Sequence, residues 1–144
     1  MFRITSTLIL FVQIAAAASD REIAEWVLRW EGHVTVAGRA QPLRDVSQLT
    51  DDIHITGVDL TPVVMPPKEL VKLEGLKDLR ELYLPGPVWN PGGGREDSTA
   101  AFKTLATLTS VERLAFGWSY NARISIRDSD IKQLTGWTKL KELR

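Results

Sequence analysis

The chain has 144 residues, of which 44% are hydrophobic and 25% are charged, a balance typical of one globular domain. Eighteen basic residues offset eighteen acidic ones, so the sequence lacks the positive field by which nucleic-acid-binding proteins attract phosphate. There is no cysteine, which excludes disulfides, thiolate nucleophiles and cysteine-based zinc sites together.

Residues 1–18 have the three parts of a secretory signal peptide. Arg3 supplies a positive charge, Leu8–Ile14 forms a short apolar stretch, and Ala15–Ala18 offers the small residues of a cleavage site. The stretch is too short to span about 30 Å of hydrocarbon, although an uncleaved anchor or a buried N-terminal helix is the alternative. We therefore expect cleavage after Ala18 or one or two residues earlier, a secreted or periplasmic protein, and no membrane span in the mature chain.

A helix is predicted to begin directly after this segment. Ser19 and Glu22 have the spacing of a capping box, which satisfies two backbone N–H groups at the start of a helix. Trp26 and Trp30 follow on one helical face and are expected to cover the core, and Gly32 stands where a helix commonly ends in glycine.

Residues 33–37 alternate with a period of two, which predicts a short strand or hairpin. A repeat protein needs a unit that covers the exposed side of its first repeat. We expect residues 19–45, with their helix and hairpin, to form such an N-terminal cap.

A pattern of leucines recurs three times in the rest of the chain. The first copy has the spacing L-x-x-L-x-x-L-x-x-L-x-L and comprises Leu73, Leu76, Leu79, Leu82 and Leu84. A continuous helix cannot place them on one face, because three residues fall about 60° short of a full turn. A helix over 67–76 and a strand over 82–84 would place them all inside. The spacing recurs thirty-two residues later in Leu105, Leu108, Val111, Leu114 and Phe116, and twenty-nine residues further on in Leu134, Trp137, Leu140 and Leu143.

A fourth and weaker unit precedes these copies. Ile53-His54-Ile55 lies twenty-nine residues before Leu82-Tyr83-Leu84, and Val46 and Leu49 provide a weak helical lead. Repeats of about this length, each with one strand and one outer element, are typical of leucine-rich-repeat proteins. Residues 46–144, with about four such units, resemble the leucine-rich-repeat proteins that bacteria export.

The resemblance implies an α/β fold. It implies a right-handed solenoid, or horseshoe, with parallel strands on the concave face, helices outside and the helix and hairpin as the cap. The sequence departs from the family pattern where an asparagine normally follows each L-x-L, since Val58, Pro87 and Ser119 stand there. The third copy stops at Arg144, inside its strand, so we expect this chain to be an N-terminal fragment.

No catalytic constellation, metal site or cofactor site is predicted. His33 and His54 are the only neutral-pH bases, and neither has a serine or a metal ligand at a recognisable spacing. Gly92–Gly94 lacks the lysine of a phosphate loop. Asp128 and Asp130 lack the further carboxylates of a calcium loop, so Asp128 is expected to cap a helix instead.

The predicted strands present a stripe of outward-pointing residues, because neighbours alternate along a strand. The stripe comprises Asp52, His54, Thr56, Glu81, Tyr83, Arg113, Ala115, Glu142 and Arg144. Its mixed charge, arginine and tyrosine favour a protein or peptide partner, although a merely solvated surface accounts for it equally well.

A second candidate surface is the loop edge beyond the strands, with Trp89, Asn90, Trp118 and Tyr120. These aromatic residues could stack on sugar rings, or pack under their own loops. The sequence thus favours a non-catalytic interaction module. The alternatives are the recognition region of a larger exported enzyme or receptor, and a glycan-binding domain.

Overall fold

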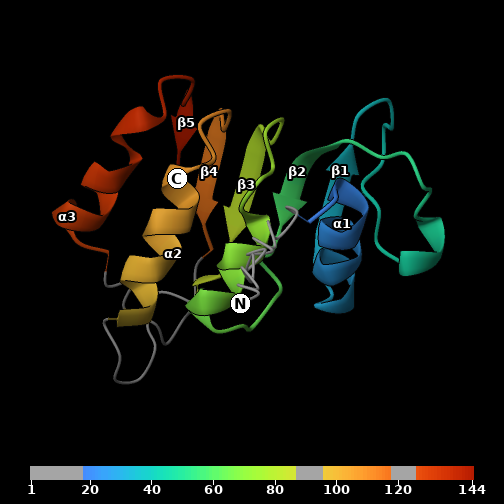
Figure 1. Cartoon of the computed structure of the whole chain (residues 1–144), viewed down its shortest axis with the longest axis horizontal. Helices are drawn as coiled ribbons and strands as arrows, with labels where there is room; N and C mark the ends of the chain where they lie inside the picture. Colours follow the sequence, from blue (N-terminus) through green and yellow to red (C-terminus); the bar gives the residue numbers. More distant parts are fainter. Residues whose placement is uncertain (1–17, 87–95, 118–125) are drawn as a thin grey trace, which may run out of the picture.

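A computed structural model describes residues 18–86, 96–117 and 126–144. These residues form one five-stranded sheet in which the strands follow one another across the molecule in chain order (Figure 1). The strands are short: β1 (His33–Val36), β2 (Ile55–Asp59), β3 (Glu81–Leu84), β4 (Arg113–Phe116) and β5 (Glu142–Leu143).

The sheet is mixed. β1 runs antiparallel to β2, whereas β2, β3, β4 and β5 are parallel to one another. The register of β1 on β2 shifts between Thr35 and Val36, which are opposite Gly57 and Ile55, so that Thr56 is the extra residue of a bulge.

Helical segments cover the sheet. The α-helices are α1 (Asp20–Arg29), α2 (Glu96–Ala106) and α3 (Asp128–Ile131), and the shorter 3-10 helices are η1 (Val46–Gln48), η2 (Pro67–Leu73) and η4 (Lys132–Gly136). α1 packs on β1 at one end of the molecule, and α2 packs between η2 and η4 (Figure 1). The order of the helices therefore follows the order of the strands.

The predicted start of α1 is confirmed, but its predicted end is not. Ser19 and Glu22 form the capping box, with Glu22 Oε2 accepting from Ser19 N at 2.8 Å. At the other end Glu31, not Gly32, adopts the left-handed conformation with φ of 63°. The N–H of Gly32 then donates to the Val27 carbonyl, which completes a Schellman motif.

A close contact with β2, and not the end of α1, requires glycine at position 32. A Cβ at this position would lie 2.9 Å from the carbonyl oxygen of Asp59 and 2.9 Å from Val27 Cγ1. The glycine therefore allows the end of α1 to lie directly against β2.

Leucines of the repeat make up much of the core. Every leucine of the first copy is buried, from Leu73 to Leu84, as predicted. Val58, Leu82, Leu114 and Leu143 lie side by side in register across the four parallel strands. Trp137 replaces a leucine in the third copy and remains buried because its indole N–H donates to the Leu105 carbonyl at 3.0 Å.

The α/β class is confirmed, but the predicted solenoid is wrong. The structure is a small α/β protein with one mixed five-stranded sheet, whose first strand is antiparallel to its neighbour. The repeated leucine spacing corresponds to units of one helix and one strand only from η2 onward. Most of the outer elements are also short, since η1, η2 and η4 have three, seven and five residues.

The predicted register of the first unit is also wrong. Val58, and not Ile53, lies opposite Leu82, and the N–H of Leu60 donates to the Tyr83 carbonyl at 2.8 Å. The segment that corresponds to Leu82-Tyr83-Leu84 is therefore Val58-Asp59-Leu60. The weak helical segment predicted around Val46 and Leu49 forms only the three-residue η1, in which Val46 is 38% exposed.

Asp128 does not cap α3. Arg127 occupies the cap position, and the carboxylate of Asp130 accepts its backbone N–H at 3.0 Å and its guanidinium at 3.0 and 3.1 Å. The buried Asp130, and not Asp128, thus closes the first turn of α3.

Within the three described ranges no helix is long and apolar enough to cross a membrane. The proposed signal segment lies outside the described residues except for Ala18.

Candidate interaction surface

One face of the sheet is polar because the buried row of leucines alternates with outward-pointing neighbours. We call the polar sheet face the set that gathers on β3, β4 and β5: Glu81, Tyr83, Arg113, Glu142 and Arg144. Glu81, Arg113 and Glu142 lie side by side in one register row, and Tyr83 lies beside Ala115 in the next. Six of the predicted stripe residues, these five and Ala115, are thus brought together.

The carboxylate of Glu81 organises the centre of this face. Its Oε1 lies 3.0 Å from Arg113 Nη2, and its Oε2 accepts a hydrogen bond of 3.1 Å from the Tyr83 hydroxyl. Arg113 remains 51% exposed and Glu81 32% exposed. The three side chains are therefore held in position while they remain accessible to a partner.

The same contacts affect the ionisation of Tyr83. Partial burial, and then the negative charge of Glu81 and the hydrogen bond to it, raise the pKa of the Tyr83 hydroxyl above its ordinary value. Arg113 opposes this shift through its positive charge. The hydroxyl stays protonated at neutral pH and acts as a donor.

Two hollows lie along the polar sheet face and share Arg113. The first, of about 300 Å³, lies over Ala115 and is bounded by Tyr83, Arg113, Glu142 and Arg144. The small side chain of Ala115 leaves this space between its larger neighbours. An ion pair between Arg144 and Glu142 borders it on the β5 side.

The second hollow, of about 360 Å³, lies toward β2. It is lined by Thr56 and by charged residues of β3, β4 and the positions before them: Arg80, Glu81, Glu112 and Arg113. Lys141 holds the carboxylate of Glu112 at 2.7 Å, and this contact lowers the pKa of Glu112. Acidic and basic groups thus alternate around this hollow.

Two of the predicted stripe residues lie elsewhere. Asp52 and His54 precede β2, and their side chains are 98% and 69% exposed, with His54 Nε2 at 4.0 Å from Asp52 Oδ1. Thr56 lies at the bulge of β2 and reaches the edge of the second hollow. Asp52 and His54 lie away from the polar sheet face because the register of β2 on β3 differs from the predicted one. It places Asp59 rather than His54 beside Tyr83.

The structure adds residues that the sequence reasoning missed. Asp59 lies opposite His33 on β1, with Oδ2 at 3.8 Å from His33 Nδ1. The signal was present in Val58-Asp59-Leu60, which has the same apolar-polar-apolar order as Leu82-Tyr83-Leu84. Each of the two histidines therefore has an aspartate nearby.

The predicted loop-edge residues Trp89, Asn90, Trp118 and Tyr120 lie outside the described residues. Among the residues that are described, no three side chains of histidine, cysteine, aspartate or glutamate are grouped so as to hold a metal ion.

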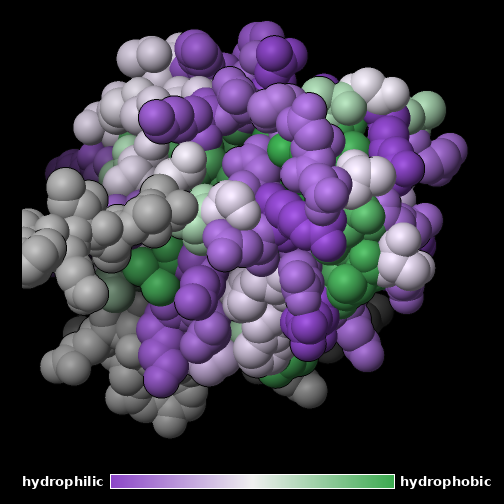
Figure 2. Space-filling model, turned by 45° about the vertical axis from the view of Figure 1, so that its right-hand side comes forward, coloured by the Kyte–Doolittle hydropathy of each residue, from purple (hydrophilic) through white to green (hydrophobic). Residues whose placement is uncertain are grey.

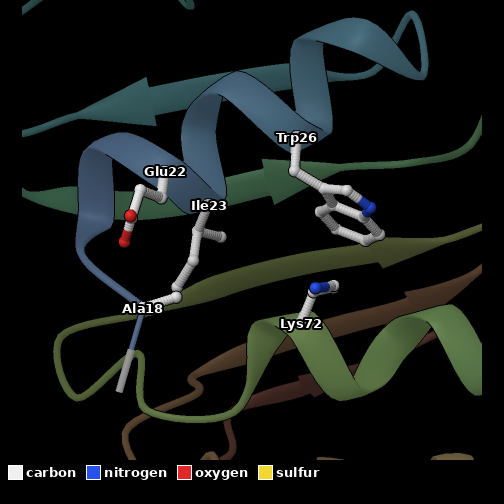
Figure 3. A pocket seen from close by; sticks show the side chains of 5 residues that line it. All are labelled: Ala18, Glu22, Ile23, Trp26 and Lys72. Atoms are coloured by element: carbon white, nitrogen blue, oxygen red, sulfur yellow. The ribbon is translucent and has the colours of Figure 1, made fainter. Parts of the chain in front are cut away.

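A further hollow, of about 340 Å³, lies between α1 and η2 (Figure 3). Trp26 points across it toward Lys72, while Glu22, Ile23 and Ala18 line the α1 side. Trp26 and Trp30 are partly buried and pack against the core, so the prediction that they cover it is confirmed.

The surface seen in Figure 2 is mainly hydrophilic, with hydrophobic residues in small separate groups. On that side the chain offers polar rather than extended apolar contact area.

No protein-family model and no curated protein matches this chain.

Proposed function

We propose that the chain is a non-catalytic interaction module that binds a protein or peptide through the polar sheet face. One observation carries the proposal: Glu81, Tyr83 and Arg113 are fixed to one another by an ion pair and a hydrogen bond, yet stay partly exposed. Arginine and tyrosine are the residue types that most often anchor protein interfaces.

The two hollows suit side chains of a partner better than a small-molecule ligand. Their volumes, about 300 and 360 Å³, are at the lower end of the range of about 300–1,000 Å³ for ligand pockets. Ligand pockets are lined mainly by apolar groups, whereas charged residues dominate the lining here. A partner residue could enter beside Ala115 and contact Tyr83 and Arg113.

The charges on this face favour selectivity over strong attraction. Arg113 and Arg144 are already paired with Glu81 and Glu142, so a partner must offer both signs of charge in a matching order. Complementary patterns of this kind discriminate between partners more than they increase affinity. We therefore expect a polypeptide with alternating charges rather than a uniformly charged polymer.

Selection of peptides from a random library displayed on phage tests this proposal. Peptides selected on the wild-type chain should bind Tyr83→Ala and Arg113→Ala about tenfold more weakly or worse, the loss of one anchor contact. Affinities would be measured by fluorescence anisotropy with the synthetic peptides.

The matched control is Lys72→Ala, which alters the hollow between α1 and η2 instead. The peptides should bind this variant as they bind the wild type. Peptides that lose affinity for Lys72→Ala and keep it for Tyr83→Ala and Arg113→Ala would contradict the proposal.

We also propose that residues 1–18 direct export of the chain. Cleavage after Ala18 would leave the capping box of Ser19 and Glu22 intact, so α1 could form without the leader. N-terminal sequencing of the protein exported by a bacterial host should read Ser19 first. Full-length chain retained in the cytoplasm would refute this assignment.

The resemblance to exported leucine-rich-repeat proteins rests on the repeated spacing and stays a prediction. The same holds for the two alternatives, the recognition region of a larger enzyme or receptor and a glycan-binding domain.

A further inference from the structure

Arg80 stands directly before β3 and lines the hollow that contains Thr56. Its backbone is fixed on both sides of the strand. The Arg80 N–H donates to the Thr56 carbonyl at 2.8 Å. The Arg80 carbonyl accepts from the N–H groups of Glu112 and Arg113 at 2.8 and 2.9 Å, while the side chain is exposed. A long basic side chain thus begins at a rigid position beside the hollow.

The other charged groups that line this hollow are already compensated. Arg113 Nη2 lies 3.0 Å from Glu81 Oε1, and Lys141 Nζ lies 2.7 Å from Glu112 Oε2. Arg80, by contrast, forms no ion pair and no side-chain hydrogen bond with any residue that the structure describes. Its guanidinium is therefore the uncompensated charge in the described lining of the hollow.

The positive charge of Arg80 acts on the space inside the hollow. The hydrogen bond from Lys141 is the main cause that lowers the pKa of the Glu112 carboxyl. The positive charges of Arg80 and Arg113 contribute to the same shift. The Arg80 guanidinium therefore lies near enough to Glu112 to favour negative charge there, and it would favour a negative group of a ligand in the same way.

The chemistry of the lining favours one carboxylate over a string of phosphates. A guanidinium offers a planar fork of N–H donors that matches the two oxygens of a carboxylate. Glu81 and Glu112 border the same hollow, so a uniformly negative polymer would also meet like charges there. A single acidic side chain can approach Arg80 without a second negative group beside it.

We propose that Arg80 determines the specificity of the polar sheet face by binding an aspartate or glutamate side chain of the partner polypeptide. The carboxylate of that side chain would accept hydrogen bonds from the Arg80 guanidinium in the hollow of about 360 Å³. This inference rests on the proposed function and adds the chemistry of one partner residue. Tyr83 and Arg113 remain the anchors.

Phage selection from one random library, on the wild-type chain and on Arg80→Glu, tests the inference. Peptides selected on the wild type should share an acidic residue at one position. Peptides selected on Arg80→Glu should carry lysine or arginine at that position, because the charge that they meet is reversed. The side chain of Arg80 contacts no described partner, so the variant should melt like the wild type in circular dichroism.

A double-mutant cycle then identifies the contact. A wild-type-selected peptide should bind Arg80→Gln about threefold to tenfold more weakly, between the effects of an exposed ion pair and of a hydrogen bond to a charged group. The same peptide with its acidic residue replaced by glutamine should lose as much on the wild type. Combining the two changes should add little further loss, since both remove one interaction.

Lys72→Gln is the matched control. Lys72 is also exposed and also lacks an ion pair within the described ranges, but it lies on η2 beside Trp26. The substitution changes the net charge of the chain as Arg80→Gln does. It should leave the affinity unchanged, which separates a local contact from a general effect of charge.

The inference is overturned if the selected peptides lack a shared acidic residue, or if they bind Arg80→Gln as they bind the wild type. The proposed function survives that result as long as Tyr83→Ala and Arg113→Ala still weaken binding. Coupling to Arg80 without any dependence on Tyr83 or Arg113 would support the carboxylate site and contradict the anchors. A library that yields no binding peptide overturns both proposals.

Discussion

Gly32 shows how one missing side chain determines how close a helix lies to the sheet. A Cβ in Gly32→Ala would lie 2.9 Å from the Asp59 carbonyl oxygen, which cannot move without disturbing β2. We expect the free energy of unfolding to fall by about 1–3 kcal/mol, the usual effect of overpacking. Urea denaturation measures it.

Gly136→Ala is the matched control for this prediction. Its new methyl group would meet nothing closer than Thr109 Cγ2 at 3.9 Å, so the free energy of unfolding should change by less than about 1 kcal/mol. Equal losses in the two variants would show that close approach to Asp59 is not the cause.

Tyr83 provides a spectroscopic test of the contacts on the polar sheet face. In a Tyr120→Phe background it is the remaining tyrosine, so the ultraviolet absorbance of the phenolate reports its pKa alone. We expect a pKa above the ordinary value of 10.0. Glu81→Gln should lower this pKa but not abolish the shift, because burial is its largest cause. An unchanged titration in Glu81→Gln would contradict the hydrogen bond.

Asp130 should contribute to stability in a pH-dependent way. The hydrogen bonds from Arg127 hold the pKa of this buried carboxyl below its ordinary value. A lowered folded-state pKa means that the stabilisation is present above the unfolded-state pKa and is lost as pH falls through the folded-state pKa. The acid limb of the stability curve should therefore be shallower in Asp130→Asn.

At neutral pH Asp130→Asn should cost about 1–3 kcal/mol, as for other hydrogen bonds to buried charged groups. Asp128→Asn is the matched control, since Asp128 is exposed and lies two residues away. The assignment of the cap to Asp130 fails if Asp128→Asn has the larger effect.

At the residue scale, the sequence identified Glu81, Tyr83, Arg113, Glu142 and Arg144 because each stands next to a leucine of a clear copy. The sequence does not place Asp52 and His54 correctly, because a constant interval of twenty-nine residues aligns Ile53-His54-Ile55 with Leu82-Tyr83-Leu84. The true interval, from Val58 to Leu82, is twenty-four. A variable connection between strands cannot be inferred from spacing alone.

At the element scale, equivalent positions of the repeat should differ in energetic weight. Leu82→Ala removes a fully buried side chain and should cost about 2–5 kcal/mol. Leu143→Ala, at the register position two strands away, should cost less than about 1 kcal/mol because Leu143 is half-exposed. Urea denaturation at low chain concentration compares them, and equal losses would contradict the described packing at β5.

The strands β3, β4 and β5 could be predicted because each carries its own leucine signal and pairs with the next copy. The antiparallel pairing of β1 with β2 could not be predicted. Residues 33–36 are separated from Asp59 by more than twenty residues, and a strand pattern does not specify the direction of a distant partner. The same limit explains why the sequence predicts a solenoid where a mixed sheet forms.

At the scale of the whole molecule, the chain places its apolar residues in one continuous core and gathers charged residues on the opposite face of the sheet. That division follows from the alternation of leucines with polar residues, which the sequence shows directly.

The most direct test is amide chemical-shift mapping of the isotope-labelled chain with a peptide selected on the wild-type protein. We expect the largest shifts in β3, β4 and β5, around Tyr83, Arg113 and Glu142, which border the hollow over Ala115. Shifts confined to α1 and η2, around Trp26 and Lys72, would contradict the assignment of binding to the polar sheet face.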